Sequence, residues 1–126
     1  MEAYEAIITR RTIRKYTDEK VSDDVIKELL SAAMSGPSAV NQRPWQFIVV
    51  TDRAQLEALA DAIKTGRYLK NSPLAIVVCG DMELEKAKGY WVQDCSIASQ
   101  NILLTAHAKG LGAVWVGGGE IGRAHV

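Results

Sequence analysis

Apolar positions recur at helical spacing in four stretches of this chain. They predict helices over residues 2–10, from Ser22 to the Gly36-Pro37 stop, over 52–63 and over 90–109. Ser22 is a good N-cap, and Asp52 with Gln55 three residues later resembles a capping box. The last stretch ends at Gly110, a natural C-cap, and is apolar around its circumference. We therefore expect this helix to be buried on several faces.

Three shorter runs, rich in apolar and β-branched residues, predict strands. They are Gln46–Thr51, Leu74–Cys79 and Ala113–Val116. Strands and helices alternate along the chain, so the pattern indicates a layered α/β or α+β protein. The 126 residues fit a single domain, and a chain of this length buries about two-thirds of its unfolded surface.

Composition narrows the functional classes. Lys plus Arg and Asp plus Glu both total 15, so the formal net charge is zero, which argues against a nucleic-acid binder. There is no apolar run of about 18 to 20 residues, as a membrane span needs, and no signal-peptide pattern, so we expect a cytoplasmic protein without membrane contact. Cys79 and Cys95 lie in apolar segments without CxxC spacing, which predicts buried, reduced thiols. His107 and His125 lack ligand-spaced partners, so we expect no metal site.

The first segment that can carry chemistry runs from Arg10 to Lys15. It holds three arginines, a lysine and a threonine within six residues. Guanidinium groups match phosphate oxygens in bidentate fashion, so these side chains can converge on one phosphate. The alternative is a solvated basic turn, since short basic runs are common.

The second segment lies between a predicted helix and a predicted strand, from Ser35 to Trp45. Two prolines bracket small and amide residues there, and such rigid loops present short side chains at fixed positions. Ser38 and Asn41 can hydrogen-bond the edge of a heteroaromatic ring. As a structural connector, the loop would use the same side chains to satisfy its own backbone.

The third segment comprises Gln100 and Asn101 on the last predicted helix and the glycines that follow Val116. Buried amides need hydrogen-bond partners, and glycines let a ligand approach the backbone closely. Core packing alone is the alternative interpretation.

Gly117, Gly119 and Gly122 spell GxGxxG after a predicted strand. A dinucleotide-binding loop also needs a following helix and a carboxylate about 20 residues further on. The sequence shows neither, so we expect no Rossmann site.

Taken together, the three segments resemble the FMN-dependent nitroreductase family. The matching pieces are RRTIRKY, then SGPSAVNQRPWQF, then the block from Asp94 through SIASQNILLTAHAKGLGAVWVGG, and the resemblance covers residues 1 to about 119. It implies an α+β fold, a three-layer sandwich with a central mixed sheet flanked by helices, with the C-terminal part missing here. It also implies a homodimer with FMN at the subunit interface.

The resemblance implies cofactor contacts for each segment. In the family the first grips the FMN phosphate and ribityl chain, the second contributes to the flavin across the dimer interface, and the glycines supply N–H groups near the isoalloxazine. Carried over, these roles fall on Arg10, Arg11, Thr12 and Arg14, on Pro37, Ser38, Ala39 and Asn41, and on Gly117 and Gly118.

The implied function is an NAD(P)H-dependent oxidoreductase of nitroreductase or flavin reductase type. Electrons from NADH or NADPH would pass through FMN to a small organic acceptor (a nitroaromatic, quinone, enone or flavin) with ping-pong kinetics. The flavin carries the chemistry, so no catalytic side chain is expected. The alternatives are a flavin-binding module without turnover, a truncated inactive fragment and a Rossmann-type nucleotide binder.

Two departures from the family pattern stand out. Arg43 occupies the position where many relatives have a glutamine, which would add positive charge near the flavin. The last residues, EIGRAHV, do not resemble the family and read like a translated sequencing adapter. We therefore expect residues 1–119 to be a partial FMN-binding domain, residues 120–126 to be a non-native tail, and this truncated chain to be impaired.

Overall fold

The computed structural model describes residues 1–117. This part of the chain forms four α-helices and two strands, joined by loops that include short 3-10 turns. In chain order the elements are α1 (Ala3–Thr9), α2 (Asp23–Met34), η1 (Ala39–Asn41), β1 (Trp45–Val50), α3 (Arg53–Ala62), η2 (Arg67–Asn71), β2 (Ala75–Gly80), η3 (Met82–Leu84) and α4 (Trp91–Ala108).

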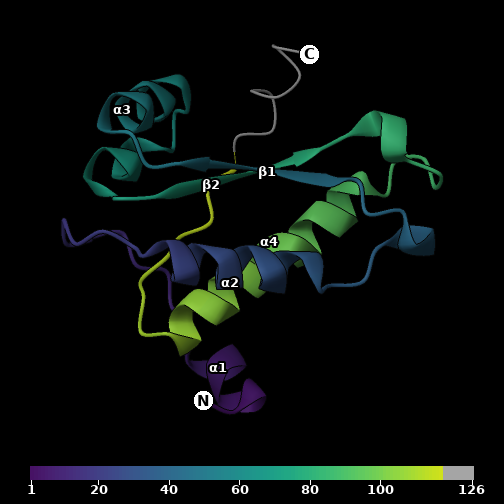
Figure 1. The fold of residues 1–126 in the computed structure, drawn as a ribbon, viewed down its shortest axis with the longest axis horizontal. Helices are drawn as coiled ribbons and strands as arrows, with labels where there is room; N and C mark the ends of the chain where they lie inside the picture. Colours follow the sequence, from purple (N-terminus) through teal and green to yellow (C-terminus); the bar gives the residue numbers. More distant parts are fainter. Residues whose placement is uncertain (118–126) are drawn as a thin grey trace.

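The two strands form the middle layer of the fold. They pair antiparallel, with Trp45 opposite Gly80 and Val50 opposite Ala75. Figure 1 shows α3 on one side of this sheet and α2 and α4 on the other. The α+β class is thereby confirmed. The sheet within residues 1–117 is antiparallel and two-stranded, where the resemblance implied a mixed sheet.

The strand expected over residues 113–116 was a wrong prediction. This segment is irregular, and it receives one backbone hydrogen bond from the basic segment, in which the Ile13 N–H donates to the Ala113 carbonyl oxygen at 3.0 Å. A β-branched run becomes a strand only where another strand lies beside it. In the described part of the chain, β1 and β2 pair with each other and not with this run.

Local signals place the helices where the sequence predicts them. The Ser22 hydroxyl accepts from the Val25 N–H at 3.3 Å, and the Asp52 carboxylate accepts from the Gln55 N–H at 3.0 Å. Gly110 follows α4 with a φ of 78°, a left-handed conformation that suits glycine. These caps satisfy N–H and C=O groups that a helix end leaves without intrahelical partners.

Helix α4 lies at the centre of the fold. It packs against α1, α2 and both strands, which confirms the prediction of burial on several faces. The buried apolar residues of α2 and α4 are Ile26, Leu29 and Ala33 in the first helix and Cys95, Ala98 and Ala106 in the second. Both cysteines are free thiols, Cys95 buried and Cys79 half-buried. Among residues 1–117, no helix has the length and apolarity that crossing a membrane requires.

Candidate functional site

The basic segment lies against the C-terminal end of α4. A Cβ atom on Gly112 would sit 2.7 Å from Ile13 Cγ2 and 2.9 Å from Ile13 Cβ, so the two backbones approach closely here. Just before the segment, the Thr9 hydroxyl lies 2.8 Å from His107 Nε2. The fold thus brings the first predicted segment beside the start of the glycine-containing stretch that leads to Gly117.

The arginines of this segment line two different hollows. Arg10 and Arg11 line a hollow of about 170 Å³ together with Thr9, Ile13, Leu103, His107, Leu111 and Ala113. Arg11 also donates from Nη1 to the carbonyl oxygens of Ile8 and Arg10, at 3.2 and 2.9 Å. Arg14 lines a separate hollow, so the side chains are not gathered at one point as the sequence suggested. Thr12, between them, is exposed.

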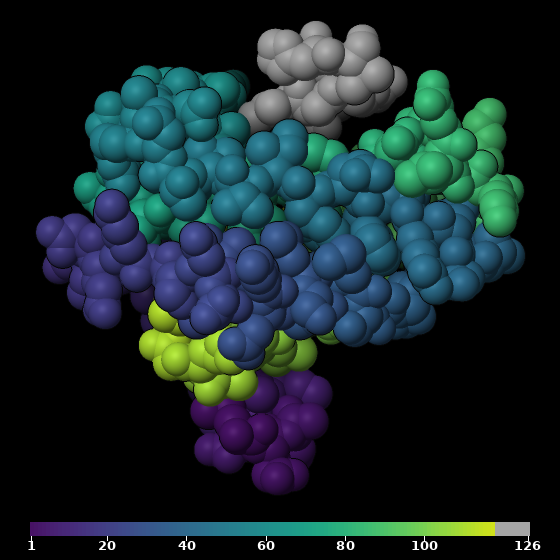
Figure 2. Space-filling model, viewed as in Figure 1, coloured from purple at the N-terminus to yellow at the C-terminus, as the bar shows by residue number. Residues whose placement is uncertain are grey.

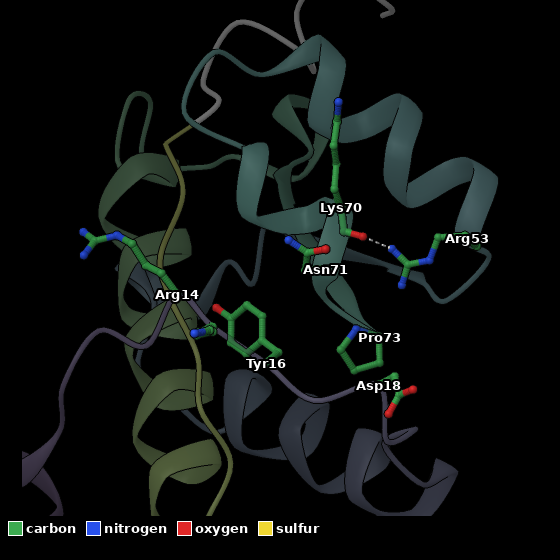
Figure 3. Close-up of a pocket in the computed structure, with 8 residues that line it drawn as sticks. Arg14, Tyr16, Asp18, Arg53, Lys70, Asn71 and Pro73 are labelled. Carbon is green, nitrogen blue, oxygen red and sulfur yellow. Dashed lines mark hydrogen bonds between the residues drawn. The ribbon is translucent and has the colours of Figure 1, made fainter.

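The hollow beside Arg14 measures about 430 Å³ (Figure 3). The Arg14 guanidinium carbon lies 5.5 Å from the centre of the Tyr68 ring, and that of Arg67 lies 5.2 Å from it. Figure 3 shows the Lys70 side chain extending away from the hollow, while Arg53 donates to the Lys70 carbonyl at 2.5 Å. Lys70 also forms an ion pair with Asp61 at 3.0 Å, so the hollow is less cationic than its lining suggests.

The second segment is a loop with unusual backbone geometry. Val40, Asn41 and Arg43 have φ values of 45°, 55° and 49°, a region that L-residues adopt at a cost of about 1–2 kcal/mol each. The Ser38 hydroxyl accepts from the Arg43 N–H at 3.1 Å, and Arg43 Nε donates to Asn41 Oδ1 at 3.0 Å. Strain of this kind persists only where surrounding contacts hold it, and it is concentrated at functional sites.

These contacts show what the loop's polar side chains do within this chain. Ser38 and the Asn41 side-chain oxygen are engaged within their own loop, as the connector interpretation proposed. Arg43 holds Asn41, a role that its charge alone did not suggest. Pro37 is exposed at the start of the loop. Asn41 is also exposed.

A buried carboxylate anchors this loop to α4. Asp94 is 2% exposed, and its two oxygens accept from the Ala39 N–H at 2.9 Å and from Gln42 Nε2 at 2.7 Å. Gln42 Oε1 accepts in turn from the N–H groups of Lys86 and Ala87, at 2.8 and 2.9 Å. The sequence reasoning missed Gln42 and gave Asp94 no role. The available signal was an acidic residue in the first turn of an apolar helix.

In the third segment, Asn101 has a structural role, and the glycine-containing stretch lies near the basic segment. Asn101 Nδ2 donates to the Ala32 carbonyl in the last turn of α2, at 3.0 Å, whereas Gln100 is exposed, contrary to the expectation of two buried amides. Gly117 is exposed, and Gly118, with the rest of the chain to residue 126, lies outside the described residues.

The first and second segments lie at opposite ends of α4 (Figure 1). The second is attached to Asp94 in the first turn, and the first directly follows Thr9, whose hydroxyl lies beside His107 in the last turn. At about 1.5 Å of rise per residue, these positions are roughly 20 Å apart along the helix. Within one chain, the two segments therefore do not face a common point.

Comparison with known proteins places this geometry in a family. The model of the Nitroreductase family matches residues 7–68 and 64–125. A protein of Methanothermobacter thermautotrophicus named "Putative NADH dehydrogenase/NAD(P)H nitroreductase" is 58% identical over 117 residues, which cover 93% of this chain and 61% of that protein. The oxygen-insensitive NADPH nitroreductase of Salmonella typhimurium is 31% identical over 126 residues, covering 90% of this chain and 52% of the relative.

Solved structures share the fold. An FMN-dependent nitroreductase from Clostridium difficile R20291 superposes with a TM-score of 0.82 at 40% identity, covering 90% of this chain and 65% of that one. A Desulfovibrio desulfuricans protein crystallised in complex with FMN superposes with a TM-score of 0.85 at 38% identity, covering 90% and 67%. The chain spans about two-thirds or less of these four relatives' own lengths. On the family match and these relatives together, the chain belongs to the nitroreductase family.

Proposed function

We propose that the full-length protein containing this chain is an FMN-dependent oxidoreductase that passes electrons from NADH or NADPH to a small organic acceptor. The observation that carries the proposal is the position of the basic segment, which lies beside α4 and the stretch leading to Gly117. Two relatives support the cofactor, since one is named FMN-dependent and the other was crystallised with FMN.

The residue types of the basic segment fit the phosphate end of FMN, although Arg14 lines a different hollow from Arg10 and Arg11. Arg11, Thr12 and Arg14 are exposed and Arg10 is half-buried, so their donors are within reach of a ligand. Arginine forks form two parallel hydrogen bonds to phosphate oxygens. Near the ring, Gly117 and Gly118 would supply backbone N–H groups without side chains in the way.

The second segment completes the site from another subunit in this proposal. Because it lies roughly 20 Å along α4 from the first, Pro37, Ser38, Ala39 and Asn41 are better placed to contact the FMN of a partner. Exposed apolar side chains favour a dimer as well. On α1, which projects from the body in Figure 2, Tyr4, Ile7 and Ile8 are 65%, 57% and 56% exposed, and apolar surface of this kind marks protein contacts.

When bound, FMN would supply the redox chemistry, accepting a hydride equivalent from NAD(P)H and releasing electrons to the acceptor. The side chains named above bind and orient it, and none is required as a nucleophile or a general acid. Donor and acceptor would use the same open face in turn, which gives ping-pong kinetics. Nitroaromatics, quinones, enones and free flavins are the acceptor classes to test.

The proposal is tested with Arg14→Ala in the full-length protein. Loss of a charged hydrogen bond to phosphate costs about 1.5–3 kcal/mol, so FMN should bind about tenfold or more weakly. Riboflavin, which lacks the phosphate, should bind as it does to the unaltered protein. Lys27→Ala removes an exposed charge from α2 and serves as the control.

Equal losses for both ligands would refute the phosphate role of Arg14. The colour of the purified protein tests the rest of the proposal. A yellow protein that NADH or NADPH bleaches is an enzyme of the proposed kind, whereas one that resists both reductants is a flavin-binding module without turnover. A colourless protein that binds neither flavin contradicts the proposal.

A further inference from the structure

The buried carboxylate of Asp94 serves a surface loop and not the core around it. Both of its oxygens accept hydrogen bonds from residues 38–43, from the Ala39 N–H and from Gln42 Nε2. The first turn of α4 offers a favourable place for this charge, because backbone N–H groups give a helix N-terminus a partial positive charge. A buried carboxylate with fixed partners holds those partners in a single arrangement.

We propose that Asp94 and Gln42 are a positioning pair that holds the loop of residues 38–43 in the conformation that receives the flavin. The inference rests on the proposed function, and it assigns to this pair a role that neither residue type shows by itself. The pair touches no flavin atom in this scheme; it acts through the loop residues Ser38, Ala39 and Asn41.

The hydrogen-bond pattern fixes the orientation of both side chains. Gln42 Oε1 accepts from two backbone N–H groups, those of Lys86 and Ala87. The amide nitrogen of Gln42 must therefore face Asp94. Because residue 94 receives this donor and the Ala39 N–H as well, it must accept at both of its side-chain oxygens. A carboxylate meets this requirement, whereas an amide of the same shape does not.

The loop needs such a brace because of its backbone. Val40, Asn41 and Arg43 all have left-handed φ values, and Val40 is β-branched, which makes this region especially unfavourable for it. Val40 is also 69% exposed, so burial of its side chain does not compensate. Polar contacts with Asp94 and Gln42, together with the bonds inside the loop, hold the strained turn, as is typical of sites where geometry matters.

Asp94→Asn is the direct test. The introduced amide has one oxygen where the carboxylate has two. Its NH2 group would therefore point at another donor, either Gln42 Nε2 or the Ala39 N–H, inside a buried network. In the flavin-free protein, the Ala39 amide should lose its protection from hydrogen exchange. FMN and riboflavin should both bind about tenfold more weakly, because the loop is proposed to contact the ring, which the two ligands share.

The reciprocal swap is the rescue. Asp94→Asn combined with Gln42→Glu moves the carboxylate across the pair, so every donor again faces an acceptor. Ala39 protection and both flavin affinities should return to within about twofold of the unaltered protein. Asp52→Ala is the stability control, since it removes the cap of α3 on the other side of the sheet. It should lower the melting temperature without changing flavin affinity.

Three results would overturn the positioning role. One is an Asp94→Asn protein in which Ala39 loses protection while both flavin affinities stay unchanged. Another is a swap that restores protection but not affinity. If the single variant does not fold, a folded swap variant with weak flavin binding leads to the same conclusion. Failure of the proposed function itself looks different, because the unaltered protein would then bind neither flavin.

Discussion

Gly112 offers a sharp test of how the basic segment is held. A Cβ atom there would lie 2.7 and 2.9 Å from two atoms of Ile13. Carbon atoms pack at about 3.5–4.0 Å, so Gly112→Ala requires a displacement of about 0.8 Å. The closer of the two atoms is a methyl group, but the other is the Ile13 Cβ, which moves only with the backbone. The basic segment must therefore shift relative to α4.

The cost follows from two opposing terms. Overpacking costs about 1–3 kcal/mol, and replacing glycine by alanine recovers about 0.4–1 kcal/mol through the unfolded chain. We expect a net loss of about 1–2 kcal/mol in the free energy of unfolding. Displaced arginines would also lose a charged contact to phosphate, so FMN should bind about tenfold more weakly and riboflavin nearly normally.

Gly36→Ala is the matched control. Its Cβ would lie 2.7 Å from Ile97 Cγ2 and 3.2 Å from Asn101 Nδ2, so its closest contact is as short and falls on α4 away from the basic segment. The loss of stability, measured by urea unfolding, should be similar, while any loss of flavin affinity should be the same for FMN and riboflavin. If Gly112→Ala changes neither unfolding nor the preference for FMN, the contact with Ile13 does not position the basic segment.

Two further predictions concern the thiol of Cys95 and the strained loop. Burial, with smaller contributions from the Asp94 carboxylate and Cys79, raises the pKa of Cys95 to about 11. The thiol ionises first in the unfolded chain, so its contribution to stability is complete below about pH 8.5 and declines as the pH rises toward 11. Thermal melting between pH 8 and 10.5 should fall more steeply for the unaltered protein than for Cys95→Ala, and parallel slopes would contradict this assignment. Val40→Gly should raise the urea midpoint, because relief of about 1–2 kcal/mol of left-handed strain exceeds the entropic cost of glycine of about 0.5–1 kcal/mol; a lower midpoint would show that the loop is not strained.

Local sequence determined the helices and their ends. Ser22, Asp52 and Gly110 act on backbone groups within a few residues, so their effect is readable from the chain alone. The family was also readable, because its three segments keep their order and residue types. The cofactor roles of Arg10 and Asn41 remain predictions, since they depend on a ligand and a partner outside this chain.

Tertiary structure decided the features that depend on contacts between residues far apart in the sequence. Residues 113–116 have the composition of a strand, but a strand also needs a neighbour, and β1 and β2 pair with each other. The bond between Gln42 and Asp94 joins residues 52 positions apart, and no local pattern specifies such a contact. The sequence contained both side chains, but only the packing of the loop onto α4 brought the amide and the carboxylate together.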